Sequence, residues 1–424
     1  MTHHTRAAAC NRDCRCLTTN RAALHSALET GLSHRTADLV AARPLLFADS
    51  AVFVSAAEVA RMGAVIAAVE GVAALPGYRD TMLSLAPPSA QRDPGPLGAF
   101  LSYDFHLTGD GPRLIEVNTN AGGALLGAAV ARAQAMCCQG PMASPGLAEL
   151  EATLFAMFRS EWQRQRGDAA LRRVAIVDDR PETQFLYPEF LLFRDLFTRQ
   201  GVEAVIVDGA ALEYHDGVLS AEGQAIDLVY NRLCDFPLTE PNHAALAQAY
   251  ADGAVVVTPH PHAHALRADK RALILLTDDA LLADWGVAAA DRATLAAGIP
   301  RTVVVTADRA EALWAARSRL FFKPTSGYGS KAAYRGDKLT RRVWGEIQAG
   351  SYVAQDLAPP SERHQAAGRP MKVDLRVFVY NGAMQFLSAR LYQGQTTNFQ
   401  TPGGGLAAVF VIDDDAMPQK DAVC

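Results

Sequence analysis

The spacing of apolar residues predicts a helical region over residues 1–97. The segments RAALHSALETGL and SAAEVARMGAVIAAVEGVAAL place apolar side chains three and four residues apart, which is the period of an amphipathic helix. A stretch with four prolines, Pro87, Pro88, Pro94 and Pro96, then ends this regular pattern.

Residues 98–165 begin with two short β-rich runs. LGAFLSYDFHL and RLIEVNTN are separated by TGDGP, whose residues are typical of a hairpin turn. The helical pattern returns over 124–165, so a hairpin followed by helices is expected here.

Residues 170–265 alternate between strand and helix patterns. RRVAIVDD and VEAVIVD read as strands on either side of the amphipathic helix PEFLLFRDLFTRQG, and IDLVYNRL reads as a later strand. Strand–helix–strand alternation predicts a parallel, Rossmann-like sheet. The G-x-G-x-x-G fingerprint is absent, so dinucleotide binding is not inferred.

Residues 266–424 form the last predicted unit. A helix is expected over ALRADKRALILLTDDALLADWG, and strands over TVVVT, LFFKP and SYVAQDL. KVDLRVFVYNGAMQFLSARLYQ predicts two strands joined by a hairpin at Asn381-Gly382.

Composition and charge narrow the classes of protein. Hydrophobic residues make up 50% and charged residues 20% of the 424-residue chain, which indicates a globular protein. The length predicts about two to three structural units. The net charge of −5 argues against a general nucleic-acid binder.

The lack of a recognisable targeting signal and the pattern of cysteines favour a cytoplasmic protein. No apolar run reaches the length of a membrane span, and no apolar signal segment is seen near residue 1. The seven cysteines show no disulfide framework, so we expect free thiols in a reducing compartment.

The segment FFKPTSGYGS is a candidate phosphate site. Lys323 follows a strand, and Gly327 and Gly329 lie in the loop after it, where glycines let backbone amides approach a phosphate. Only six of the 40 basic residues are lysines, which draws attention to each of them. The alternative is an ordinary β-turn beside an exposed lysine.

Three oxygen donors are expected to meet on the first hairpin. Glu116 and Asn118 are two residues apart on one strand and so share a face, and Asp104 can face Glu116 across the hairpin. Such a set suits Mg²⁺ bridging nucleotide phosphates. The alternative is a polar face of the hairpin.

The last hairpin carries two arginines that could clamp an anion. Arg376 shares a strand face with Asp374, and Arg390 lies on the partner strand. Asn398 and Gly404 follow, and we assign them to substrate binding. Taken alone, this pattern is better explained as a surface arginine ladder.

Together these segments resemble the ATP-grasp superfamily, in the circularly permuted arrangement of eukaryotic glutathione synthetase. IEVNTNAGG resembles the metal-binding segment of that family, ADKRALILL and FFKP resemble the two nucleotide-binding lysine segments, and SYVAQDL resembles the hinge. The metal-binding segment precedes the lysines here, whereas in most of the superfamily it follows them.

The resemblance implies a role for each matching residue. It implies that Mg²⁺ is held by Asp104, Glu116 and Asn118; that ATP is held by Lys270 and Lys323 and by the hinge backbone near Val353, Ala354 and Gln355; and that phosphate is met by Arg376 and Arg390. It also implies a possible homodimer. TSGYGS lacks the acidic metal ligand that glutathione synthetase has in this loop, and the substrate is not carried over.

Three other features have two interpretations each. Arg232, at the end of a strand, could bind a substrate carboxylate or be an ordinary strand-end arginine. His260, His262 and His264 suggest a metal site but are better explained as a solvated linker. The three cysteines near residue 1 are expected to be free thiols rather than a zinc site, namely Cys10, Cys14 and Cys16.

The sequence thus predicts a mixed α/β ATP-grasp protein with four segments, 1–97, 98–165, 170–265 and 266–424. The expected activity is an ATP- and Mg²⁺-dependent ligase that joins a small-molecule carboxylate to an amine through an acylphosphate. The alternatives are a kinase of the same fold and a nucleotide-binding regulatory protein without turnover. Neither a nucleic acid nor a membrane is an expected partner.

Overall fold

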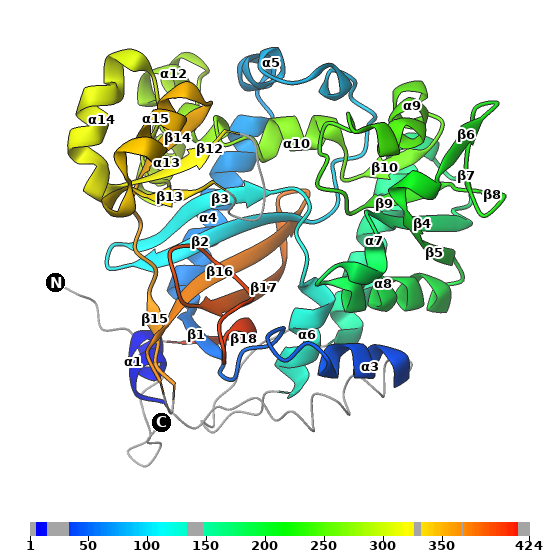
Figure 1. The fold of residues 1–424 in the computed structure, drawn as a ribbon, viewed down its shortest axis with the longest axis horizontal. Coiled ribbons are helices and arrows are strands. Elements are labelled where there is room, and N and C mark those ends of the chain that lie inside the picture. Colours follow the sequence, from blue (N-terminus) through cyan, green and yellow to red (C-terminus); the bar gives the residue numbers. More distant parts are fainter. Residues whose placement is uncertain (1–5, 15–33, 134–146, 326–331, 366–367, 414–424) are drawn as a thin grey trace.

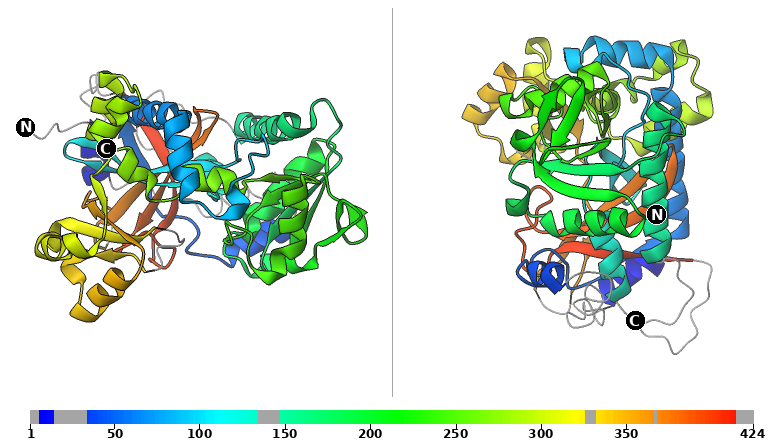
Figure 2. Two further views of the ribbon diagram at one scale, coloured as in Figure 1. Left: turned by 90° about the horizontal axis from the view of Figure 1, so that it is seen from above. Right: turned by 90° about the vertical axis from the view of Figure 1, so that its right-hand side faces the viewer.

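Four sheets with their helices make up the described part of the chain. The computed structural model describes residues 6–14, 34–133, 147–325, 332–365 and 368–413, without the side chains of 34–37 and 147. Figure 1 shows a main sheet in the centre, a small sheet with helices at the upper left, and a parallel sheet with its helices at the right. From above, the small and parallel sheets lie at opposite ends of the molecule (Figure 2).

The main sheet has seven strands, and residues far apart in the sequence build it. Its order is β1-β18-β17-β16-β2-β3, with β15 also paired to β16. All neighbours are antiparallel except β1 and β18. The strands are β1 (Val52–Ser55), β2 (Leu101–Thr108), β3 (Gly111–Asn118), β15 (Glu362–Arg363), β16 (Met371–Tyr380), β17 (Ala383–Tyr392) and β18 (Gly405–Ile412).

Both predicted hairpins of the main sheet are confirmed. The β16–β17 turn has Asn381 and Gly382 at φ 49° and 74°, which is the two-residue geometry that favours asparagine and glycine. β2 and β3 pair across the predicted turn, with a bulge between Asp104 and Phe105.

The region before residue 97 is not purely helical. β1 pairs with β18 in parallel, a strand that the helical pattern did not predict. Four residues are too few to show a period, and VFVS is rich in β-branched and aromatic side chains. The helices described there are α1 (Arg6–Asp13), α3 (His34–Ala41), α4 (Ala56–Ala73) and α5 (Pro76–Ser84).

α4 covers one face of the main sheet, as its apolar spacing predicts. Ser55 and Glu58 form a capping box at its start. Its apolar face packs into the core beneath β16 and β17. No single helix in the described ranges is long and apolar enough to cross a membrane; α4 and α5 meet those criteria only as a pair bent by 76°.

The predicted parallel sheet is present. Its order is β10-β9-β4-β5, and all its neighbours are parallel. The strands are β4 (Arg173–Asp178), β5 (Glu203–Asp208), β9 (Leu228–Asn231) and β10 (Val256–Thr258); the helices around them are α7 (Leu147–Arg166), α8 (Tyr187–Arg199) and α9 (Ala244–Asp252). α6 (Ala124–Ala133) packs on β18 of the main sheet and contacts α7 and α8. A separate meander follows β5, formed by β6 (Glu213–His215), β7 (Val218–Ala221) and β8 (Gln224–Ala225).

The small sheet is antiparallel, in the order β11-β14-β12-β13. Its core is aromatic, with Phe322 packing on Trp344. The elements are β11 (Thr302–Val304), β12 (Leu320–Pro324), β13 (Tyr334–Arg335) and β14 (Tyr352–Asp356), with α14 (Ala310–Ala316) and α15 (Arg341–Ala349). α13 (Ala289–Gly298), which precedes β11, packs on α4 and β3.

Two expectations for residues 260–287 are wrong. The expected long helix is broken into three, α10 (Pro261–Arg267), α11 (Ala272–Leu275) and α12 (Asp279–Asp284). Asp278 caps the start of α12, because its side chain accepts from Leu281 N. The histidines do not form a solvated linker, because His260 and His262 are buried and hydrogen-bonded to the carbonyls of Pro96 and Ala90.

Candidate active site

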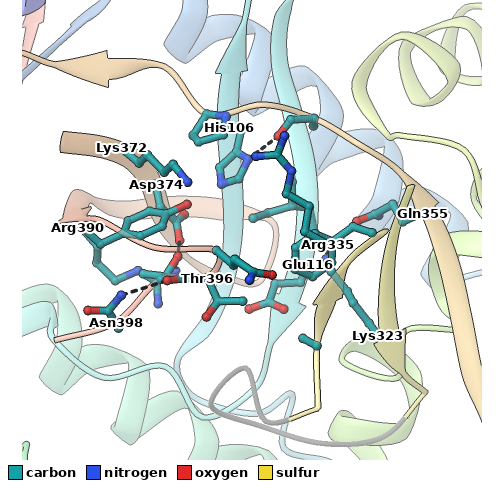
Figure 3. A pocket seen from close by; sticks show the side chains of 18 of the residues that line it. His106, Glu116, Lys323, Arg335, Gln355, Lys372, Asp374, Arg390, Thr396 and Asn398 are labelled. Carbon is teal, nitrogen blue, oxygen red and sulfur yellow. Dashed lines mark hydrogen bonds and ion pairs between the residues drawn. The ribbon is translucent and has the colours of Figure 1, made fainter. Parts of the chain in front are cut away.

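A cavity of about 760 Å³ lies between the small sheet and the polar face of the main sheet. Figure 3 shows Lys323 and Gln355 entering it from the small sheet, and Glu116, Asp374 and Arg390 from the main sheet. Residues 395–400 of the loop 393–404, which we call the cavity loop, form a third wall. Of the six lysines, Lys270, Lys323 and Lys372 line it.

Lys323 is the cation of the small sheet. It is 7% exposed, and its Nζ donates to Ile115 O at 2.8 Å and to Gln355 Oε1 at 2.9 Å. Burial lowers the pKa of Lys323 to about 8, although Glu116 opposes this shift. Lys270 lines the same cavity, and its backbone N donates to Thr325 O at 3.2 Å.

Glu116 and Asn118 face the cavity from β3. Both are half-buried, and Asn118 Nδ2 lies 3.3 Å from Glu116 Oε1. Burial would raise the pKa of Glu116, but Lys323 and Lys270 lower it below its usual range. The ionised carboxylate therefore lies beside two lysines.

Asp104 lies beneath them and is fully buried. Arg376 binds it in a bidentate manner, from Nε to Oδ1 at 2.8 Å and from Nη2 to Oδ2 at 2.7 Å. Arg390 Nη2 and Asn118 Nδ2 also donate to Oδ2, at 2.7 and 3.0 Å. Burial would raise the pKa of Asp104, but the two guanidiniums hold it well below its usual range.

Asp374 is the neighbouring carboxylate on β16 and lines the cavity. Thr397 Oγ1 donates to its Oδ2 at 2.7 Å, and Arg390 Nη2 does so at 2.5 Å. Its Oδ1 is buried and has no hydrogen-bond partner in the described part of the chain. Burial raises the pKa of Asp374, with Arg390 opposing the shift. This oxygen could accept from a bound ligand or join a metal site.

His106 stands next to Asp374 across the strand pair. Its Nδ1 donates to Ala358 O at 2.6 Å, which ties β2 to the segment after β14. Burial lowers the pKa of His106, so the ring is neutral near pH 7.

The predicted hinge meets the cavity only in part. Gln355 and the residues after it, up to Pro360, line the cavity. Val353 and Ala354 are buried inside the small sheet, where β14 pairs with a strand on either side. The structure therefore brings the segment 355–360, rather than 353–354, to the cavity.

Arg232 lies behind the turn that follows Asn118 and does not line the cavity. Its Nη1 donates to Asn120 Oδ1 at 2.6 Å and to the carbonyls of Asn120 and Ala121 at 3.3 Å. The same turn favours glycine at position 123, where φ is +102°, and Gly122 packs closely against Leu186.

Two other predicted substrate residues shape the cavity loop. Asn398 Nδ2 donates to Gln393 O at 2.7 Å and to Thr396 O at 3.0 Å, so this side chain binds its own loop. Gly404 packs against β17, where a Cβ would lie 2.4 Å from Leu391 O. Gly327 and Gly329 lie outside the described residues.

Several cavity residues were not predicted as site residues. The alternation of a strand could have indicated His106, which is two residues from Asp104, and Lys372, which is four from Arg376. Lys372 Nζ donates to Gly394 O and so holds the cavity loop. Nothing in the sequence indicates Phe185 or Phe399, which the tertiary fold alone brings to the cavity.

A second cluster of polar side chains lies outside the cavity, after β4. His243 is fully buried; its Nδ1 lies 2.8 Å from Asp235 Oδ2 and its Nε2 lies 3.0 Å from Asp179 Oδ1. Burial opposes protonation, but the two carboxylates raise the pKa of His243. Asp179, Glu240 and His243 each have a potential metal-ligand atom, and these three atoms lie within 4.8 Å of one another.

Comparison with solved structures identifies the fold. A glutathione synthetase-like effector, GSS30 from Globodera pallida, superposes with a TM-score of 0.54 over 92% of this chain and 97% of that one, at 11% identity. The fold is glutathione synthetase-like. The ATP-grasp-like fold implied by the sequence resemblance is thereby confirmed, and at this identity the likeness shows the fold alone.

Two further solved structures are less similar. A putative gamma-glutamylcysteine synthetase from Methylobacillus flagellatus matches with a TM-score of 0.46 and 9% identity, over 80% of this chain and 83% of that one. The ATP-grasp ligase PsnB, complexed with minimal precursor, Mg and ADP, matches with a TM-score of 0.29 and 13% identity, over 58% and 90%. At these TM-scores the two likenesses add nothing to the argument. No protein-family model and no curated protein matches this chain.

Proposed function

We propose that this chain is an ATP-dependent ligase that joins a carboxylate to an amine. The observation that supports it most is the meeting of lysines, carboxylates and arginines from four separate segments in one cavity, from Glu116 to Arg390. A glutathione synthetase-like fold with this cavity suits a nucleotide and a second ligand, since ligand pockets usually span about 300–1,000 Å³.

The chain's own residues would divide the work as follows. Lys270 and Lys323 bind phosphate oxygens of ATP, and segment 355–360 lies along the adenine. Arg376 and Arg390 bind the anionic oxygens of the acyl group while charge develops on them. The cavity loop excludes water, which protects a reactive acylphosphate from hydrolysis.

The reaction has two steps. An oxygen of the substrate carboxylate attacks the γ-phosphorus, the bond to the β-phosphate breaks, and ADP leaves. The amine nitrogen then attacks the acyl carbon, phosphate leaves with the oxygen, and the amine gives up a proton to water. Positioning and charge stabilisation suffice, so no protein nucleophile is invoked.

The donor set fits Mg²⁺. Glu116 and Asn118 offer oxygens at the cavity wall, and the unpartnered Asp374 Oδ1 lies on the same sheet face. Asp104 would join them once Arg376 and Arg390 turn from its carboxylate to a bound anion. Mg²⁺, when bound, neutralises charge on phosphate oxygens.

Finer features of the architecture belong to the same proposal. The carboxylate strands β2 and β3 precede the lysine segments in the sequence, which supports a circularly permuted ATP-grasp order. The parallel sheet supports a Rossmann-like unit at 170–265, between the proposed segments 98–165 and 266–424, with 1–97 as a separate segment. A homodimer in the cytoplasm stays a prediction.

The test is ADP release from Mg-ATP with matched pools of acids and amines. Release that requires both partners, forms an amide and is lost in Lys323→Ala would support the ligase. Release with one acceptor and a phosphorylated product would establish a kinase instead. ATP binding without release from any pool would favour a regulatory protein, and no ATP binding would overturn the proposal.

A further inference from the structure

Two aromatic rings from different parts of the chain form one wall of the cavity. The rings of Phe185 and Phe399 have centroids 5.0 Å apart and planes tilted by 35°. Both line the cavity. Phe185 precedes α8 beside the parallel sheet, whereas Phe399 belongs to the cavity loop, so this pair closes the cavity between the two.

Phe185 is an exposed apolar side chain that lines the cavity. The described residues have four exposed large hydrophobic side chains, Leu85, Phe185, Val218 and Met384, and of these only Phe185 lines the cavity. It is 37% exposed. An apolar surface left open to a cavity is a surface that a ligand can cover.

The backbone on either side of Phe185 is held by hydrogen bonds. Gln184 Nε2 donates to Asp179 O at 2.6 Å, and Tyr187 N donates to Gln184 O at 3.1 Å, which fixes the turn on either side of the ring. The next residue, Leu186, packs against Gly122. Leu186 thus packs against the turn at Gly122, whereas Phe185 lines the cavity beside Phe399.

Phe399 is also held in place, by the residue before it. Asn398 Nδ2 binds two carbonyls of the cavity loop, and Asn398 Oδ1 accepts from Gln400 N at 2.9 Å and from Thr401 Oγ1 at 3.1 Å. These bonds cross the loop on both sides of Phe399. Rigid presentation of a side chain is what substrate discrimination requires.

Other apolar side chains, such as Phe321 and Leu357, line the cavity on the side of the small sheet, where the nucleotide is proposed to bind, so the aromatic pair belongs to a different wall. Lys270, Lys323 and Glu116 suit phosphate and metal, and Arg376 and Arg390 suit a carboxylate. None of these groups would recognise an apolar side chain. The rings of Phe185 and Phe399 would recognise one.

We propose that the Phe185–Phe399 pair selects a substrate with an aromatic side chain, namely an aromatic amino acid or a peptide ending in one. The inference rests on the proposed ligase function, because it assigns the ring to one of the two condensing substrates. Its charged end would face the arginines, and its ring would pack against the pair in the offset or edge geometry that aromatic rings prefer.

The experiment compares substrates that differ only in side chain. Phenylalanine and alanine are each offered as the acid, blocked at the amine, and as the amine, blocked at the carboxylate, with ADP release measured for the protein, Phe185→Ala and Phe399→Ala. Leu85→Ala and Val218→Ala, whose side chains are exposed away from the cavity, serve as controls.

We expect kcat/KM to be at least about 10-fold higher for the phenylalanine form, and most of this preference to be lost through KM in both cavity variants. The KM for ATP should stay unchanged in both cavity variants. The two control variants should keep the full preference for the phenylalanine form. An equal response to phenylalanine and alanine in the unaltered protein, or a preference that survives both substitutions, would overturn the inference.

A second measurement needs no turnover and so separates this inference from the ligase proposal. Saturation-transfer NMR should show contacts to the ring of phenylalaninamide that are lost in Phe185→Ala and Phe399→Ala and kept in the controls. Ring contacts without ADP release from any pair would support the aromatic wall and count against the ligase. Release without such contacts would support the ligase and overturn the wall.

Discussion

Replacing Asp104 by asparagine would test how the buried charges of the site balance. The carboxylate is fully buried and takes two hydrogen bonds from Arg376 and one from Arg390, all at 2.7–2.8 Å. Asn keeps the shape but removes the negative charge between two guanidiniums that are only 11% and 12% exposed. Breaking a buried ion pair in this way costs about 3–5 kcal/mol.

Thermal unfolding followed by circular dichroism would measure this loss. At roughly 2–4 °C per kcal/mol, Asp104→Asn should melt about 6–20 °C lower. Hydrogen exchange should also speed up in β16 and β17, which carry the two arginines. Asp110→Asn is the matched control, because this carboxylate lies at the turn of the same hairpin with its side chain 85% exposed, and its loss should leave the melting temperature nearly unchanged.

The pH dependence gives a second check with a definite sign. The pKa of Asp104 is lower in the folded chain than its unfolded value of about 3.9. A depressed carboxyl pKa stabilises the fold above the unfolded pKa, and that stability is lost as the pH falls below it. The difference in melting temperature between Asp104→Asn and the unaltered protein should stay constant from pH 5 to 8 and become smaller below about pH 4. An Asp104→Asn variant with the same melting temperature as the unaltered protein at neutral pH would refute this reasoning.

Three further outcomes are expected. Glu116→Gln should raise the Mg²⁺ concentration needed for ADP release by at least about 10-fold, measured by metal titration. With the pKa of Lys323 at about 8, kcat/KM for ATP should fall as the pH rises through that value, because the cation is lost, and Lys323→Arg should move the fall to higher pH. Arg363→Leu removes a fully buried guanidinium that donates to Ala51 O and Cys14 O, both at 2.7 Å. Each stranded carbonyl costs about 1–3 kcal/mol, so α1 should detach and be cleaved faster in limited proteolysis.

Local patterns predicted the parts of the site that lie on hairpins. Period-two spacing placed Glu116 and Asn118 on one face, and Asn381-Gly382 predicted the turn that sets Arg390 opposite Asp374. These relations involve residues within about 20 positions of one another, where backbone geometry leaves few choices.

Relations over long distances were out of reach. β1 is only four residues long, and its place beside β18 depends on a pairing across more than 350 residues. His260 and His262 look polar in sequence, yet they are buried because carbonyls of residues 90 and 96 satisfy their nitrogens. Phe185 and Phe399 meet for the same kind of reason, since nothing near either residue points to the other.

The order of the strands in the main sheet also determines when this sheet can form while the chain is being synthesised. Asp104 meets Arg376 across 272 residues of chain. At about 5–20 residues per second, the β2–β3 hairpin leaves the ribosome roughly 15–55 s before its partner strand exists. During that interval one edge of β2 and an unpaired carboxylate face solvent or a chaperone. The face of the main sheet on which Asp104 meets Arg376 would thus be among the last parts of the molecule to form, after the parallel sheet and the small sheet have been made.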